Sequence, residues 1–210
     1  MDSHLAQLGR RDISKTELFE KVEADFGLLP LLFEGTSSNK ASVRYGCGSV
    51  LLDLSEKHPE MLYPYIDKFI GLLDSKHRIL TWNALAAIAN LTKVDQELKF
   101  DAIFNKYYNY LGSEYMVTVA NVVVNSAKIV SNKPYLAQKI TVELLKVQDL
   151  QTTPHLTEEC KLVIAEHAIQ TFSTIINYTQ NKKALLEFAQ KHQNSTRISL
   201  RKEADSFLKK

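Results

Sequence analysis

The sequence predicts an all-α fold, a right-handed α-solenoid of about five helical hairpins. The chain contains five helix-like centres: Cys47, Ala84, Ala120, Ala168 and Ala204. Each centre is flanked by apolar or small residues four positions before it, three and four positions after it, and usually seven positions after it. These centres lie 37, 36, 48 and 36 residues apart, and periods of this size are typical of stacked helical repeats. Only seven glycines and five prolines occur in 210 residues, which disfavours a sheet with many tight turns.

The start of the chain contains the first helix signal. Residues 1–13 are polar and without periodicity, so we expect a flexible N-terminal tail there. Ser14 and Glu17 have the spacing of a capping box, in which each residue satisfies a free amide of the other. We therefore predict a single repeat domain over residues 14–210.

Each hairpin is expected to contain a first helix, called A, and a second helix, called B. The first B helix is predicted over residues 40–57, and it stops at His58 because a residue before proline avoids helical geometry. The second hairpin covers residues 59–91. Its A helix begins at Pro59, where no amide hydrogen is needed. Small centres such as Cys47, flanked by Gly46 and Gly48, should let neighbouring helices pack closely.

The third and fourth hairpins deviate from a simple pattern. Residues 117–124 are β-branched enough to suggest a strand, but the repeat spacing predicts a helix. We expect that helix to bury Met116, Ala120, Val123, Val124 and Ala127. A long connection near residues 148–157 should absorb the twelve extra residues, and Thr157 should cap the next B helix.

The sequence resembles HEAT and armadillo repeat proteins in two stretches. These are residues 40–54, with Val43-Arg44, and residues 59–91, PEMLYPYIDKFIGLLDSKHRILTWNALAAIANL. Pro64 is similar to the bend of HEAT first helices, and residues 84–91 are similar to the last helix of an armadillo repeat. The resemblance implies HEAT-like hairpins over nearly the whole chain, with B helices lining a concave surface.

Net charge, cysteine positions and the lengths of apolar runs limit the class of protein and the compartment that we expect. The formal net charge is +2, too small by itself to predict nucleic-acid or membrane binding, although residues 182–210 hold eight Lys or Arg and three acids. Cys47 and Cys160 are far apart, which favours a reducing compartment over a disulfide framework. No apolar run approaches a membrane span and no secretory signal is evident. We expect a cytoplasmic protein.

Enzyme motifs are not found. The sequence has no glycine-rich phosphate loop, no HExxH and no CxxC, so we expect no catalytic residues, no cofactor and no metal site. Cys160 and His167 are two helical turns apart and could form a thiolate–imidazole pair. A buried thiol beside a surface histidine is the better interpretation of that spacing.

The candidate site is a mildly polar groove on the B helices that binds another protein or peptide. Aromatic residues commonly anchor protein recognition, and the site has an aromatic pair with polar support: Tyr45, Trp82, Ser49, Asp53, Asn90, Asn125 and Gln170. Trp82 packing between repeats is an equally weighted interpretation. Armadillo import receptors pair such an asparagine with a tryptophan one turn earlier. Here that position is Ala86, so Asn90 is better interpreted as bonding to local backbone.

Two alternatives stay open. A DNA-binding or DNA-repair protein similar to the HEAT-like glycosylases would use Trp82 and Asp53, but the B-helix positions hold few cations, namely Arg44, Lys202 and Lys209. Phosphate contacts dominate DNA affinity, so protein binding is the preferred hypothesis. Self-association through an exposed end of the repeat array is the other alternative.

Overall fold

The computed structural model describes residues 4–10 and 12–209, and every regular element of that part of the chain is helical apart from one isolated bridge. The chain divides into two compact units, residues 1–99 (unit 1) and residues 100–210 (unit 2). Each is described by itself. The single domain expected over residues 14–210 stays a prediction. In the described part of the chain, no helix has the length and apolarity needed to cross a membrane.

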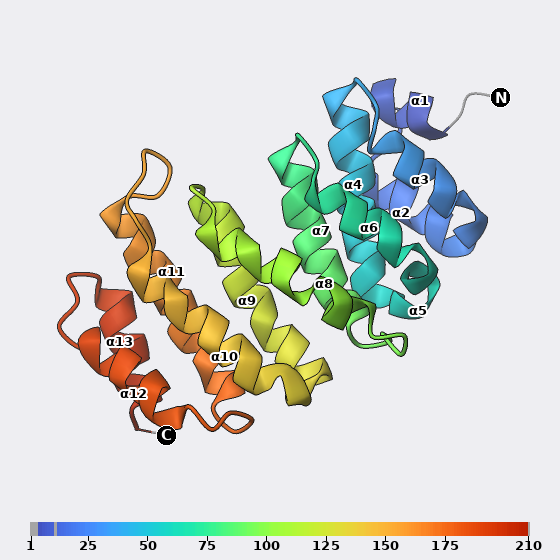
Figure 1. Cartoon of the computed structure of the whole chain (residues 1–210). Helices are drawn as coiled ribbons and strands as arrows, with labels where there is room; N and C mark the ends of the chain where they lie inside the picture. Colours follow the sequence, from blue (N-terminus) through green and yellow to red (C-terminus); the bar gives the residue numbers. More distant parts are fainter. Residues whose placement is uncertain (1–3, 11, 210) are drawn as a thin grey trace. The chain divides into compact units, whose positions relative to one another are not determined.

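Unit 1 contains two complete hairpins preceded by two further helices (Figure 1). Helices α3 and α4 form the first hairpin; α5, α6 and α7 form the second, in which α5 and α6 together are the A helix. Helix α4 packs against α1, α2, α3 and α7. The bounds are α1 His4–Arg10, α2 Lys15–Ala24, α3 Leu29–Gly35, α4 Ala41–Lys57, α5 Pro59–Leu62, α6 Ile66–Leu73 and α7 Arg78–Leu91, with 3-10 turns at Phe26–Leu28 and Tyr63–Tyr65.

The beginning of unit 1 differs from the expected tail. Residues 4–10 form α1, and Leu8 is buried with 5% of its surface exposed. Helix α1 packs against α4, and its seven residues are too few to show a helical period in the sequence. Residues 1–3 and 11 of the expected tail lie outside the described residues.

The predicted start and stop signals of unit 1 are confirmed. The Glu17 amide donates to the Ser14 hydroxyl at 3.1 Å, and the Ser14 amide donates to the Glu17 carboxylate at 2.7 Å. Helix α4 ends at Lys57, and α5 begins at Pro59. At Pro64 the A helix is interrupted by the turn Tyr63–Tyr65, because proline cannot donate the hydrogen bond that would continue it.

Close packing around the glycines of α4 is also confirmed. A Cβ atom added to Gly46 would lie 2.9 Å from a methyl of Leu8, and one added to Gly48 would lie 2.6 Å from a methyl of Leu80. Cys47, between them, is fully buried. The two glycines therefore let α1 and α7 approach the α4 backbone, as the sequence predicted.

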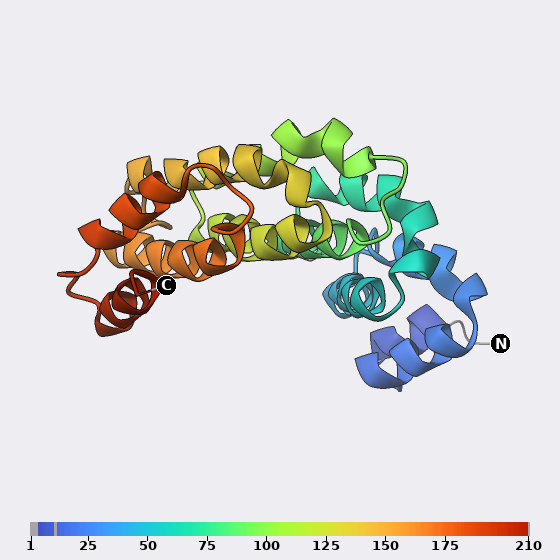
Figure 2. The same ribbon diagram turned by 90° about the horizontal axis from the view of Figure 1, so that it is seen from below.

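Unit 2 contains three hairpins in two layers, which Figure 2 shows from below. The A helices are α8, α10 and α12, and the B helices are α9, α11 and α13. The bounds are α8 Lys99–Tyr108 (whose first residue belongs to unit 1), α9 Met116–Asn132, α10 Ala137–Leu145, α11 Glu158–Ile175, α12 Lys182–Lys191 and α13 Ile198–Phe207, with 3-10 turns at Asn109–Gly112, Pro134–Leu136 and Lys146–Asp149. Together the two units hold five hairpins, the predicted number.

The predicted register of α9 is wrong, although its helical state is confirmed. Val124 is 48% exposed, and Met116, Ala120 and Ala127 are only half-buried. Of the predicted residues only Val123 is buried, and the buried face otherwise includes Val119, Val122, Ser126, Ile129 and Val130. Valines at residues 117, 119, 122, 123 and 124 surround the helix, so the sequence pattern does not identify one inner face.

A repeated ion pair supports the hairpin spacing independently in each unit. In unit 1 the Lys99 ammonium lies 2.8 Å from the Asp67 carboxylate, and in unit 2 the Lys133 ammonium lies 3.0 Å from the Asp101 carboxylate. Lysine and aspartate are 32 residues apart in both pairs. Equivalent residues on successive hairpins therefore make equivalent contacts within each unit.

Candidate protein-binding surface

The surface of unit 1 centres on two aromatic side chains carried by neighbouring B helices. Tyr45 precedes the fully buried Cys47 of α4 by two residues, and Trp82 precedes the fully buried Ala84 of α7 by two residues. Helices α4 and α7 pack side by side. The two aromatic residues hold the same position relative to their helix centres, and both are half-buried.

Tyr45 borders a pocket of about 700 Å³. The pocket lies where the segment between α1 and α2 meets the first turns of α4. Its walls combine apolar residues with as many polar or charged ones: Leu8, Asp12, Ile13, Ser14, Lys15, Glu17, Ala41, Ser42, Tyr45 and Gly46. A hollow of this size beside a tyrosine can accept a side chain of a partner.

Arg44 lies beneath this surface and is 8% exposed. One of its terminal nitrogens donates to the carbonyl oxygens of Ser38 at 2.7 Å and Asn39 at 3.3 Å. Its guanidinium carbon lies 4.7 Å from the centre of the Tyr45 ring, a cation–π distance. The Nε atom is buried without a hydrogen-bond partner, and no carboxylate of the described residues forms an ion pair with this side chain.

His77 connects the two B helices. It is the N-cap residue of α7, and its ring meets the Tyr45 ring edge to face at 6.1 Å between centroids. Burial lowers the pKa of His77, and the positive charges of Arg44 and Lys76 lower it further. Both effects favour the neutral imidazole, and the surroundings of His77 are electropositive.

The other predicted site residues of unit 1 have different environments. Ser49 is half-buried, one turn along α4 from Tyr45, and Asp53 is exposed one turn further. Burial raises the pKa of Asp53, Lys15 lowers it and Glu56 raises it, with a net upward shift. Arg44, expected among the groove cations, lies instead below the surface.

Asn90 is 6% exposed and donates to the Ser55 hydroxyl at 2.9 Å. Its amide therefore joins α7 to α4 inside unit 1 through a side-chain hydrogen bond that the sequence did not predict. We leave Asn90 out of the proposed surface.

Asn125 and Gln170 belong to unit 2. The half-buried Asn125 amide donates to the Asn121 carbonyl one turn earlier in α9, at 2.8 Å. Gln170 is exposed, and its amide oxygen lies 3.2 Å from Nδ1 of His167. The structure thus brings Tyr45, Ser49, Asp53 and Trp82 onto adjacent helices of one unit and places these two residues in the other.

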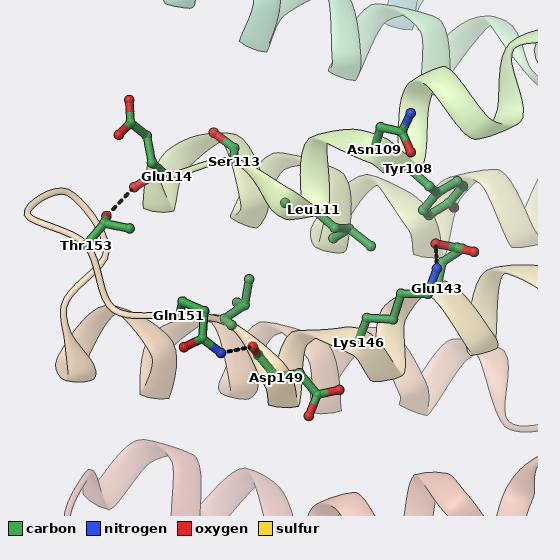
Figure 3. Close-up of a pocket in the computed structure, with 12 residues that line it drawn as sticks. Tyr108, Asn109, Leu111, Ser113, Glu114, Glu143, Lys146, Asp149, Gln151 and Thr153 are labelled. Atoms are coloured by element: carbon green, nitrogen blue, oxygen red, sulfur yellow. Dashed lines mark hydrogen bonds and ion pairs between the residues drawn. The ribbon is translucent and has the colours of Figure 1, made fainter.

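The sequence did not reveal a pocket of about 430 Å³ in unit 2 (Figure 3). The long connection closes one side of it, because the Thr153 hydroxyl donates to the Glu114 carbonyl at 2.9 Å and the His155 ring stacks on Tyr115 at 4.6 Å. The only signal was the twelve extra residues. Figure 3 shows the carboxylates of Glu114 and Asp149 turned away from the space between the two segments. Glu143 and Lys146, which also line the pocket, form an ion pair with each other at 2.6 Å.

The two cysteines are free thiols. Burial raises the pKa of Cys47 to about 12, so this thiol stays protonated and unreactive. The Cys160 sulfur accepts from the Thr157 hydroxyl at 3.2 Å. Among the described residues, no group of three or more His, Cys, Asp or Glu is arranged to hold a metal ion.

Solved structures share this architecture. A designed armadillo repeat protein is similar with a TM-score of 0.64 at 18% sequence identity, covering 98% of this chain and 89% of the designed protein. An engineered protein is similar with a TM-score of 0.60 at 18% identity, covering 98% of this chain and 86% of that protein. The fold is a helical repeat solenoid. No family model and no curated protein sequence matches the chain.

Proposed function

We propose that the chain is a non-catalytic protein-binding module that holds a segment of another protein on the α4–α7 surface of unit 1. The observation that carries this proposal is the pair of partly exposed aromatic residues, Tyr45 and Trp82, at equivalent positions on adjacent B helices. Aromatic side chains supply much of the energy of protein recognition when the partner desolvates them. Ser49 and Asp53 add polar groups one and two turns beyond Tyr45 on α4.

Two aromatic pairs allow a controlled test. Tyr45→Ala with Trp82→Ala removes the proposed anchors, whereas Tyr135→Ala with Tyr178→Ala removes two exposed tyrosines of unit 2, which are 59% and 53% exposed. Affinity capture of native partners, quantified by mass spectrometry and accompanied by circular dichroism to verify folding, compares the two variants. We expect the first to lose bound partner at least tenfold and the second to retain it. Equal retention by both folded variants would contradict the proposed placement.

DNA binding is the alternative function. The observation in its favour is the excess of basic residues over 182–210. Against it, the Arg197 guanidinium in this segment is already paired with Glu159 at 2.6 Å and Glu166 at 2.7 Å. A mobility-shift assay with duplex DNA over a range of salt concentrations tests this alternative, because phosphate binding weakens steeply with salt.

A further inference from the structure

We propose that the segment held by unit 1 is acidic, and that its carboxylates bind at the N-terminal ends of α4 and α7. This inference rests on the proposed function, because it names the chemistry of the partner at the same surface. It starts from Arg44, a buried cation that no acid of the described residues neutralises. Burying an unpaired charge is unfavourable, so an anion brought next to this site gains an uncompensated attraction.

The starts of the two helices add to this positive potential. Helix α4 has 17 residues and α7 has 14; neither has an acidic residue in its first turn, and neither N-cap side chain bonds to a helix amide. The first-turn amides point out of each helix, and the helix dipoles favour negative charge at these ends. Lys40 is the N-cap of α4, and Lys76 precedes the N-cap of α7; both are exposed.

Three independent features thus meet at one edge of unit 1: two open helix starts, two exposed lysines and the buried guanidinium of Arg44. Arg44 reaches back from the second turn of α4 toward the loop at residues 38–39 and lies over Tyr45. Its charge is also close enough to His77, at the start of α7, to lower the pKa of that imidazole. A carboxylate at this edge would face both helix starts and the uncompensated guanidinium charge.

The neighbouring groups favour a peptide over a nucleic acid. Tyr45, Trp82 and the apolar part of the pocket can hold side chains, which a peptide provides together with its carboxylates. Asp53 is exposed further along α4, and Asp12 and Glu17 line the pocket. These acids would repel the continuous row of phosphates that nucleic-acid affinity requires, whereas a short acidic segment need only reach the helix starts.

The experiment selects ligands without assuming a partner. A phage library of random dodecapeptides is selected on the whole chain, and enriched peptides are synthesised in two forms, one unchanged and one with Asp and Glu replaced by Asn and Gln. We expect the selected peptides to be enriched in Asp and Glu, and the amide forms to bind at least tenfold more weakly.

Matched lysine variants locate the site. Lys40→Gln with Lys76→Gln removes two charges at the helix starts, whereas Lys21→Gln with Lys93→Gln removes two exposed charges elsewhere in unit 1. We expect the first pair to weaken binding of the acidic peptide roughly tenfold, about 1.4 kcal/mol, and the second to have a much smaller effect. All four lysines are exposed, so the fold should tolerate each change.

The outcomes separate this inference from the proposed function. Peptides that depend on Tyr45 and Trp82 but bind equally well as amides would overturn the acidic partner and leave the proposed function standing. If no selected peptide depends on Tyr45 and Trp82, the proposed function fails and this inference fails with it. Displacement of the peptide by an 18-base-pair DNA duplex, lost in the Lys40→Gln, Lys76→Gln variant, would assign the site to nucleic acid and overturn the inference.

Discussion

The N-terminal ends of α11 and α13 in unit 2 differ in charge from those of α4 and α7 in unit 1, whereas α9 of unit 2 also starts without a side-chain cap or a first-turn acid. In unit 2, the Thr157 hydroxyl caps α11 and two glutamates occupy the first turn. Arg197, the N-cap of α13, is paired with Glu159 and Glu166. In unit 1, α4 and α7 follow Lys40 and His77 with no side-chain cap and no first-turn acid. One architecture can therefore neutralise its helix starts internally or leave them open to a ligand.

The substitution with the largest expected loss of stability tests whether unit 1 and unit 2 unfold independently. Phe172 is fully buried in unit 2, and its ring lies 5.3 Å from Phe188 and 6.4 Å from Phe207. Phe172→Ala should destabilise unit 2 by about 3–5 kcal/mol, because it removes apolar contacts and leaves a cavity. Urea unfolding followed by circular dichroism should show the loss.

The single tryptophan, Trp82, reports on unit 1 during the same titration. We expect its fluorescence midpoint to stay unchanged in Phe172→Ala and to fall in Phe69→Ala, a matched change in the core of unit 1. An equal shift of the Trp82 midpoint in both variants would show that the units unfold together.

A smaller effect compares two buried hydrogen bonds at similar helix positions. Asn90 bonds to Ser55 at 2.9 Å in unit 1, and Ser126 bonds to Tyr108 at 3.0 Å in unit 2. Asn90→Ala and Ser126→Ala should each cost about 1–3 kcal/mol, because each substitution removes a partner of a buried polar group. Only Asn90→Ala should move the Trp82 midpoint. A neutral Asn90→Ala would mean that its amide does not join the two helices.

Removing the cap of α11 and adding one to α7 tests the difference between the helix starts of the two units. Thr157→Ala removes the cap of α11 and should cost about 1 kcal/mol. His77→Ser adds a cap to α7 and should raise the stability of unit 1 by less than Thr157→Ala costs. Thermal unfolding measures both. If His77→Ser lowers the Trp82 midpoint, the contacts of His77 stabilise unit 1 more than a serine cap would.

The smallest effect concerns acid stability. Burial raises the pKa of Glu166, but hydrogen bonds from Arg197 and Ser199 outweigh it and hold the pKa below the ordinary value of 4.5. This contribution is present above about pH 4.5 and is lost as the pH falls through the lowered folded-state pKa. Glu166→Gln should remove up to about 1 kcal/mol at pH 7 and progressively less as the pH falls below about 4.5. Glu187→Gln, at a more exposed pair, is the control; an equal loss in both variants would contradict a special role for Glu166.

The sequence predicted the fold where local signals are strong. Ser14, Pro59, Pro64 and Thr157 each impose a helix boundary through backbone chemistry, and the structure confirms all four. The register of α9 could not be derived, because its valines make all sides apolar and only packing selects the face that is buried.

The candidate site was predictable only in part. The repeat spacing placed Tyr45 and Trp82 on corresponding helix positions. The hydrogen bond from Asn90 to Ser55 could not be predicted, because the two residues are 35 positions apart and a sequence pattern carries no pairing information at that distance. The burial of Arg44 depends on the loop carbonyls at residues 38 and 39, to which its side chain donates. The sequence therefore could not predict that this cation is buried.

The most direct test of the account is amide hydrogen exchange of the whole chain, with and without a selected acidic peptide. The first-turn amides of α4 and α7 lack intrahelical acceptors and should exchange rapidly in the free chain. The account predicts that the peptide slows exchange at residues 41–43 and 78–79 and leaves the first turns of α11 and α13 unchanged. Protection confined to unit 2, or unchanged exchange at α4 and α7 with the peptide bound, would contradict it.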